Sequence, residues 1–533
     1  MAFVYNEPST QQSLFGTMTS IGSKTLEDLQ NSWAQVFRDH IFPAIDESLF
    51  EPLYSDFGRP NFPVNIFVAL EIIKHMKNYT DEELFEAYKF DLQVAYAVGL
   101  QFLGEKPFAE RTFYDFRKRV YDYTLTNPEN DLIFAQFQKL TAYFCELMNI
   151  DTTIQRMDSF QVASNIKIAG RLSLAVDVLI KGVRAIPEKL LAEELKPVVQ
   201  SNYARRITYH SRSQDVGTRL DEVLRLIEQT LLLAQEHGLD VLEEIKLLAR
   251  FLDEQTEIVP ETKTRRTKDN KEIEAAALQS AHDPDATYRA KGNKKHHGFV
   301  ANITETCSPE NDTQIITDYD LNPNIKPDTE MLEERLPVIQ EETKIEELVV
   351  DGGYYSGDLE TEDVKVHHTD MTGSKENPDK VPLAEFEYNE DNSEVIACPA
   401  GQAPIETELD EKGNLTAHFD RSICESCPHQ GSCRVQLQKN SAVLRTSQKA
   451  VAASQTRQEI YDPENRTENL SLRAGVEGTG SALKRAEGAG KLRVRGLTRC
   501  KVVFGFKVIG RNFKQFCRAL ARAPRKQKLA LAV

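Results

Sequence analysis

The sequence predicts an α/β fold, because three acidic residues stand where strands and a helix are expected to meet. Two short strand-like runs end at an acid, Asp158 in TTIQRMDSFQ and Asp351 in EELVVDGGYYSG. A third acid, Glu477, lies in the helical stretch SLRAGVEGTGSALKR. Ligands of open α/β sheets bind beyond the carboxyl ends of strands, which is where Asp351 stands. An Asp, Asp, Glu set of this kind suits phosphoryl transfer with two metal ions.

The helical stretch places charges of both signs on one face. Arg473, Glu477 and Lys484 follow one another at spacings of four and seven residues, which 3.6 residues per turn bring into line. An acid between two cations can hold a metal ion and steady neighbouring phosphates. The alternative is a pair of salt bridges to Glu477, since charged pairs at this spacing are common on solvated helices.

Small residues in the same stretch predict close packing. Gly475, Gly478 and Gly480 each cost a helix up to ~1 kcal/mol relative to Ala. Gly475, Gly478 and Ala482 fall on one face, and we expect that face to pack on the sheet and bring Glu477 near the two aspartates.

The spacing Arg473-x3-Glu477-x6-Lys484 resembles the R-(3)-E-(6)-K signature of bacterial insertion-sequence DDE transposases. The sequence Asp351-Gly-Gly-Tyr-Tyr is similar to the second-aspartate motif of that family, and Asp158-Ser to the first. The resemblance extends over residues 58–518. One position departs from the signature, because the family has a Tyr three residues before the Arg, where this chain has a Leu at position 470.

The resemblance implies a ribonuclease H-like, mixed-sheet catalytic core and the activity of a DNA transposase. Asp158, Asp351 and Glu477 would hold two Mg²⁺ ions, and Arg473 and Lys484 would contact phosphates near the scissile bond. Water would first free a 3′-OH at the end of the element, and that 3′-OH would then attack target DNA. The partners implied are double-stranded DNA, as terminal inverted repeats and as target, and further copies of the same chain.

Two other functions stay open. The first is a metal-dependent nuclease that cuts without joining, against which the R-E-K triplet and the basic C-terminus speak. The second is an inactive, transposase-derived DNA-binding protein, which the Leu at position 470 leaves open although the three acids are intact.

The charge of the chain is acidic on average and basic locally. The 533 residues have a net charge of −17, which argues against nucleic acid, but residues 484–533 contain fifteen Lys and Arg and one acid, Glu487. A local basic face is what phosphate contact requires. The sequence has no apolar run approaching the ~20 residues of a membrane span and no secretion signal at its start. We therefore expect a cytoplasmic, nucleoid-associated bacterial protein with no membrane partner.

Two domains are expected. Residues 1–150 should form a helical domain that recognises DNA ends, with helices at 64–77, 111–120 and 131–148 and a capping box of Thr80 and Glu83. Residues 151–533 should form the catalytic domain, with a helical insertion at 161–290 and a Cys-rich insertion at 372–465. Within the first insertion, apolar residues recurring over 220–234 and 242–252 predict an αα-hairpin. A crossover helix at 331–345 should precede a parallel strand at 347–350.

Seven basic residues are candidates for DNA contact. Three come from RTFYDFRKRV in the first domain, where an amphipathic helix with a solvated basic side is the alternative. The others lie before the second catalytic strand and after the R-E-K stretch, where the closing part resembles that of the family. The seven are Arg111, Arg117, Arg119, Arg289, Lys291, Arg493 and Arg495.

Four cysteines predict a structural zinc site resembling a zinc ribbon. Cys398, Cys424, Cys427 and Cys433 supply the four thiolates that a closed tetrahedral site needs, and a reducing cytosol disfavours disulfides. Similar CPxG…CxxC…C segments occur in several transposases of this kind. Reduced thiols without metal are the alternative.

Overall fold

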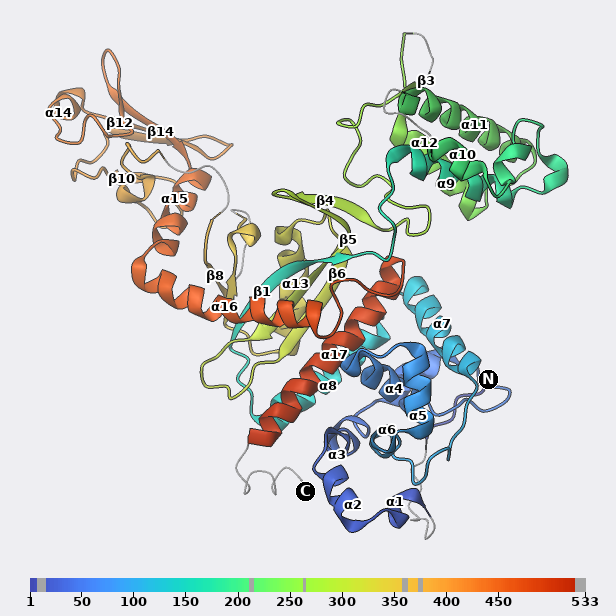
Figure 1. The fold of residues 1–533 in the computed structure, drawn as a ribbon. Coiled ribbons are helices and arrows are strands. Elements are labelled where there is room, and N and C mark those ends of the chain that lie inside the picture. The colour runs from blue at the N-terminus through green and yellow to red at the C-terminus, as the bar shows by residue number, and fades with distance from the viewer. Residues whose placement is uncertain (7–15, 210–214, 262–264, 357–362, 372–376, 523–533) are drawn as a thin grey trace.

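A six-stranded mixed sheet forms the centre of the molecule (Figure 1). The structure, a computed structural model, describes residues 1–6, 16–209, 215–261, 265–356, 363–371 and 377–522. Residues 523–533, the end of the basic C-terminal segment, lie outside this part. Among the described residues no helix is both long enough and apolar enough to cross a bilayer.

The strand order of the sheet is β4-β5-β1-β7-β8, with β6 paired to β5. β7 is parallel to both of its neighbours, whereas β5 is antiparallel to β1, β4 and β6. This mixed sheet fits the expected ribonuclease H-like core, and the strands predicted at Asp158 and before Asp351 are both present. The prediction that the first strand ends at Asp158 is wrong, because pairing with β5 continues to Ala163 and leaves Asp158 in the middle of β1. The strands are β1 (Ile154–Ala163), β4 (Thr287–Lys291), β5 (Lys294–Thr306), β6 (Ile316–Pro323), β7 (Glu347–Val350) and β8 (Lys365–His368).

The two faces of β1 pack against different helices, because successive side chains of a strand point to opposite sides. Met157 is buried with Leu332 and Ile339 of α13 (Asp328–Glu342), the predicted crossover helix. The other face meets α16 (Pro463–Arg485), which runs across the sheet in Figure 1. Asp158, one residue after Met157, therefore lies on the side of α16.

The N-terminal helices share one hydrophobic core with the sheet. The long helix α17 (Leu497–Arg522) contacts α4, α7, α8 and β6, and its apolar side chains belong to the same buried cluster as those of the first 150 residues. The predicted capping box of Thr80 and Glu83 begins α5. The α-helices of this region are α1 (Thr17–Ser20), α2 (Ser23–Gln30), α3 (Trp33–Val36), α4 (Val64–Lys77), α5 (Asp81–Phe90), α6 (Leu92–Ala97), α7 (Glu110–Thr126) and α8 (Leu132–Met148). The region also contains the π-helix η1 (Phe37–Ile41) and the 3₁₀ helix η2 (Glu47–Leu53).

Between β1 and β4 the chain forms a helical unit with its own buried core. The predicted αα-hairpin is present as α11 and α12, which both pack on α9. The elements of the unit are α9 (Arg171–Ala185), η3 (Glu188–Leu190), η4 (Lys196–Val199), α10 (Tyr203–Thr208), α11 (Val216–Glu236), α12 (Glu243–Gln255), β2 (Thr256–Ile258) and β3 (Arg265–Thr267).

A Cys-rich module, residues 377–460, lies between β8 and α16 and also has a core of its own. Its main sheet has the order β11-β12-β14-β13. Figure 1 shows this module and the helical unit on opposite sides of the central sheet. Its elements are η7 (Leu383–Glu385), β9 (Glu387–Tyr388), β10 (Val395–Ala397), β11 (Glu406–Leu409), β12 (Asn414–Phe419), α14 (Arg421–Glu425), β13 (Gln436–Leu437), β14 (Ala442–Ser447) and α15 (Gln448–Ile460).

Candidate active site

The three predicted carboxylates converge on one guanidinium group. Arg473 of α16 lies 3.8 Å from Asp158 of β1, 3.5 Å from Asp351 after β7, and 3.2 Å from Glu477 one helical turn further on. Asp158 and Arg473 are each 19% exposed, whereas Glu477 is 60% exposed. Side chains separated by more than 300 residues of sequence are thus brought together at the contact of α16 with the sheet.

Asp351 is held by the sharp turn that follows β7. Its carboxylate accepts a hydrogen bond of 2.8 Å from the backbone N–H of Gly353, at the start of the turn η6 (Gly352–Tyr354). A Cβ atom on Gly352 would come within 2.6 Å of the carbonyl oxygen of Asp370. Gly352 therefore allows the close approach of two backbone segments that fixes the direction of Asp351.

The site concentrates negative charge at a half-enclosed position. The pKa of Asp158 is raised to about 6, chiefly by burial; the Arg473 guanidinium opposes this rise, and the Asp351 and Glu477 carboxylates add to it. Three carboxylates around one cation leave an excess of negative charge. A site of this kind favours a further cation.

The chemistry of this donor set fits Mg²⁺, which prefers carboxylate oxygens. In the described residues, however, no group of three or more His, Cys, Asp or Glu side chains is arranged to hold a metal ion. Arg473 instead stands among the carboxylates, and its buried Nε has no hydrogen-bond partner. Asp158, Asp351 and Glu477 are the residues that would hold Mg²⁺. The Arg473 guanidinium would then have to move away from part of the space that it occupies between them.

Lys484 lies on the same helix but does not pair with Glu477 in the described contacts. Its Nζ lies over the ring of Phe160 on β1, 5.3 Å from the ring centre. Leu470, at the position where the family signature has Tyr, is exposed. The expected glycine face is only partly correct, because Gly475 packs on Arg156 and Gly480 on Phe160, whereas Gly478 has no atom within 4 Å of an added Cβ.

The DNA-contact candidates of α7 differ in accessibility. Arg111 is 83% exposed and pairs only with Asp115 of its own helix. Arg119 lies against the ring of Tyr54. Arg117 is 13% exposed and forms ion pairs with the buried Glu71 and with Asp81. Because its guanidinium is already enclosed by two carboxylates, we leave Arg117 out of the set proposed to contact phosphates.

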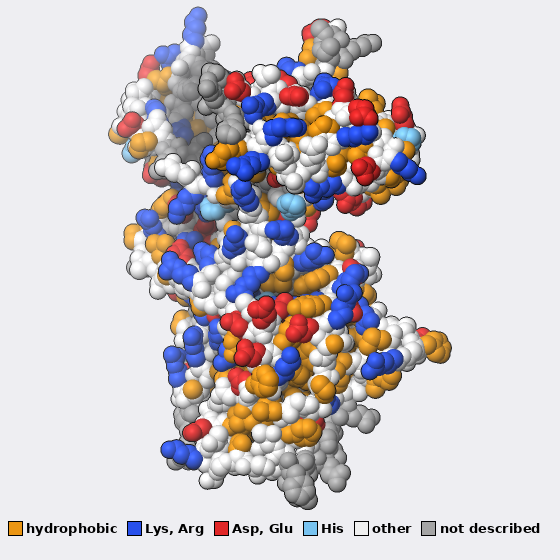
Figure 2. All heavy atoms as spheres, turned by 45° about the vertical axis from the view of Figure 1, so that its right-hand side comes forward, with side chains coloured by type: hydrophobic (Ala, Val, Ile, Leu, Met, Phe, Trp, Pro, Cys, Tyr) orange, Lys and Arg blue, Asp and Glu red, His pale blue; other side chains and the backbone are white. Residues whose placement is uncertain are grey.

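The other candidates lie at the surface. Lys291 is exposed at the end of β4, and Arg289 donates to the carbonyl oxygen of Asn324. Arg493 and Arg495 donate to the carbonyl oxygens of Tyr79 and Asn165. Figure 2 shows one face of the molecule on which Lys and Arg side chains are interspersed with Asp and Glu. The basic charge is thus spread over this face.

The four cysteines of the module are neighbours in space. Burial raises the pKa of the Cys424 thiol, and the sulfur atoms of Cys433, Cys398 and Cys427 raise it further. All four are free of disulfides. They nonetheless form no arranged metal-binding group in the described residues.

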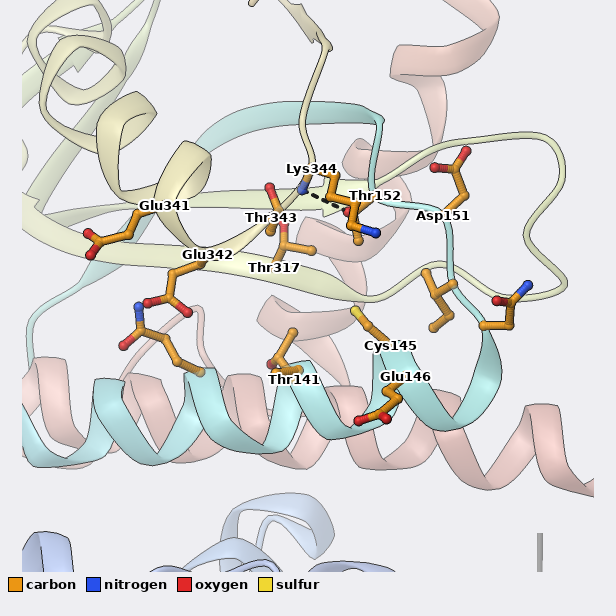
Figure 3. Close-up of a pocket in the computed structure, with 14 residues that line it drawn as sticks. Thr141, Cys145, Glu146, Asp151, Thr152, Thr317, Glu341, Glu342, Thr343 and Lys344 are labelled. Carbon is orange, nitrogen blue, oxygen red and sulfur yellow. Dashed lines mark hydrogen bonds between the residues drawn. The ribbon is translucent and has the colours of Figure 1, made fainter.

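One cavity of the protein lies away from Asp158, Asp351 and Glu477. It has a volume of about 730 Å³ and opens between α8, the segment before β1 and the end of α13 (Figure 3). Glu146, Asp151, Glu341 and Glu342 line it, together with Cys145. None of the predicted catalytic or DNA-contact residues belongs to this cavity.

No function is predicted from the sequence for Arg156, which is buried beside the site. Arg156 lies two residues before Asp158, on the same face of β1, and donates hydrogen bonds to Glu305 of β5 and to the backbone of α16. The alternation of side chains along β1 could have indicated that Arg156 lies near the site, since it places Arg156 and Asp158 on the same face of the strand.

Two family models match the chain. A Transposase DDE domain matches residues 397–517, which include the four cysteines and the R-E-K stretch, and a Transposase domain (DUF772) matches residues 25–119. Asp158 and Asp351 lie outside both matches. Comparison with curated proteins and with solved structures finds no match.

Proposed function

The chain belongs to the DDE transposases of insertion sequences, and from this we propose that it binds the ends of its element and catalyses strand cleavage and strand transfer with Asp158, Asp351 and Glu477. The observation that supports the proposal is the convergence of these carboxylates on Arg473, within 4 Å in each case.

The proposed reaction is the replacement of one phosphodiester oxygen by another. In the first step a water oxygen bonds to phosphorus and the 3′ oxygen at the element's end leaves, taking up a proton. In the second step that 3′-OH bonds to phosphorus in target DNA and displaces a target 3′ oxygen. Both steps develop negative charge on the phosphate oxygens, which the site must neutralise.

The residues of the chain divide this work. The three carboxylates hold Mg²⁺, which when bound supplies Lewis-acid activation of the phosphate and the attacking oxygen. Arg473 orients the carboxylates and, with Mg²⁺ bound to them, would be free to donate to a phosphate oxygen. Lys484, held over Phe160 of the central strand β1, contacts the backbone of the same DNA strand.

The rest of the chain binds and positions DNA in this proposal. Residues 1–150 recognise the element ends, using the exposed Arg111 and Arg119 of α7, while Arg289, Lys291, Arg493 and Arg495 contact phosphates closer to the site. The Cys-rich module is held together by a structural Zn²⁺ on its four cysteines. Two ends are brought together by a homo-oligomer, because joining them requires two active sites near each other.

Cleavage of labelled DNA with the flanking element ends tests the proposal. Wild type is compared with Glu477→Gln in Mg²⁺ and in Ca²⁺, and DNA binding is measured in parallel. We expect nicking by wild type in Mg²⁺ alone and a loss of at least ~100-fold in the variant, with binding retained. Equal cleavage by the two proteins would contradict the role of the carboxylates. Binding without cleavage by either would favour an inactive, DNA-binding relative.

A further inference from the structure

Arg156 stands beneath the helix that contributes Arg473 and Glu477. It lies on β1 and is buried, with 9% of its surface exposed. Its Nε and Nη2 lie 2.8 Å and 2.7 Å from one carboxylate oxygen of Glu305 on β5. Because Glu305 is itself buried, its contacts restrain the Arg156 guanidinium relative to the sheet.

The remaining nitrogen of the same guanidinium reaches α16. Nη1 of Arg156 donates a hydrogen bond to the backbone carbonyl oxygen of Leu472. Leu472 directly precedes Arg473, the residue on which the three carboxylates converge. The contact therefore joins the central sheet to the backbone of α16 immediately before Arg473, whose side chain contacts all three carboxylates.

Gly475 makes this contact possible. A Cβ atom at Gly475 would overlap Nη1, Nη2 and Cζ of Arg156. Gly478, three residues further along α16, has nothing within 4 Å of an added Cβ. The position of the Arg156 guanidinium thus requires a residue without a side chain at position 475. Nothing in the described structure requires one at position 478.

The first half of α16 is joined to the sheet by polar contacts, which include the ion pairs of Arg473 with Asp158 and Asp351. Among its described side chains none is buried before Val476. Hydrophobic packing therefore holds the helix from Val476 onward, at Leu483 for example. The hydrogen bond from Arg156 is made to Leu472, on the N-terminal side of this packed part. The next residue, Arg473, contacts Asp158 and Asp351.

We propose that Arg156 is a positioning residue of the transposase, which seats α16 through Leu472 and Gly475 so that Arg473 and Glu477 face the two aspartates. Arg156 does not touch the reacting atoms, since its guanidinium is occupied by Glu305 and by the helix backbone. The proposal rests on the proposed function. A misplacement of about 1 Å at a catalytic group costs about 100-fold in rate.

The test is single-turnover cleavage by Gly475→Ala, with Gly478→Ala as the matched control on the same helix. The Cβ of Gly475→Ala displaces the Arg156 guanidinium from Leu472, so we expect cleavage to fall about 100-fold. DNA affinity should change little when it is measured well below the unfolding transition, although the overlap with a buried side chain lowers the midpoint of thermal unfolding. Gly478→Ala should cleave within a factor of about 3 of wild type, because Ala favours a helix over Gly.

Arg156→Lys tests the same contact without adding an atom to α16. A Lys keeps the charge beside Glu305, but its single ammonium group cannot bond Glu305 and the Leu472 carbonyl in the same way. We expect it to lose cleavage and retain DNA binding. The double variant with Gly475→Ala should lose no more than the worse single variant, because both changes break one contact.

The outcomes separate this inference from the proposed function. Cleavage by Gly475→Ala equal to that of Gly478→Ala, or losses in the two single variants that multiply in the double variant, would overturn the role of Arg156. A wild-type protein that shows no Mg²⁺-dependent cleavage would overturn the proposed function instead. If Gly475→Ala unfolds, the cleavage and DNA binding of Arg156→Lys decide the question.

Discussion

Removal of the Arg117 guanidinium should destabilise the protein without acting through DNA. Arg117 of α7 pairs with Glu71 of α4 and, at 2.8 Å, with Asp81 of α5. The Glu71 side chain is only 4% exposed, so Arg117→Ala leaves a carboxylate buried with weaker compensation. Removing one partner of a buried pair costs about 3–5 kcal/mol.

The lower end of that range applies here. Two other groups remain near the carboxylates, since the Lys74 ammonium lies 2.7 Å from Asp81 and the His75 ring, which is neutral above a pKa of about 4, lies 3.4 Å from Glu71. We therefore expect a loss of about 3 kcal/mol, which is a factor of roughly a hundred in the ratio of folded to unfolded protein. Arg111→Ala is the control, because an exposed pair contributes about 0–1 kcal/mol.

The assay is urea unfolding followed by tryptophan fluorescence. Trp33 is the single tryptophan of the sequence, and it lies in the N-terminal helices with Lys77 of α4 over its ring. Its emission therefore reports on the region that Arg117 joins. An unfolding midpoint of Arg117→Ala equal to that of Arg111→Ala, together with a loss of DNA affinity, would refute this reasoning and return Arg117 to the DNA-contact residues.

Three further predictions concern pH, zinc and packing. Burial lowers the pKa of His75 to about 4, although the neighbouring Glu71 raises it. Between pH 6.5 and 4 the unfolded state therefore binds a proton at this position that the folded state does not. As the pH falls through this window, the urea midpoint of wild type should fall relative to that of His75→Phe, because the opposite contribution of Asp158, whose pKa is raised to about 6, is common to both proteins; equal slopes would contradict this. Cys424→Ser should lower the zinc bound per chain and lower the temperature at which the Cys-rich module unfolds; equal zinc content in both proteins would exclude the thiolate site. Gly182→Ala should cost about 1–3 kcal/mol because its Cβ would overlap Leu248 of α12, whereas Gly217→Ala, with open space around it, should be neutral or stabilising, and thermal unfolding of the two distinguishes them.

The strand that carries Asp158 and the strand that ends before Asp351 could be predicted from the sequence because their signals are local, although β1 continues to Ala163 and does not end at Asp158. Alternation around Asp158 and the apolar run before Asp351 define β1 and β7, and the period of three and four residues defines α11 and α12. The spacing of the R-E-K stretch placed Glu477 on a helix, and the two family matches agree with the resemblance. These features depend on neighbours within about ten residues.

Features that depend on distant contacts were not predictable in the same way. Arg117 has the sequence context of a solvated basic helix, and only the packing of α4 and α5 shows that it is enclosed. Gly475 and Gly478 look equivalent in the sequence, whereas Arg156 lies beneath only one of them. The core shared by α17 and the first 150 residues likewise arises from segments at the two ends of the chain.

The measurement that tests the central claim most directly is cleavage by Asp351→Cys in Mg²⁺ and in Mn²⁺. A thiolate binds Mg²⁺ poorly and accepts softer divalent metals, so the preference of the reaction for a metal reports on the ligand itself. Binding of Mg²⁺ by the Asp351 carboxylate predicts that the variant is inactive in Mg²⁺ and regains activity in Mn²⁺, while wild type is active in both. Equal activity of the variant in the two metals, or its retention of wild-type activity in Mg²⁺, would contradict a metal-binding role for the carboxylates gathered around Arg473.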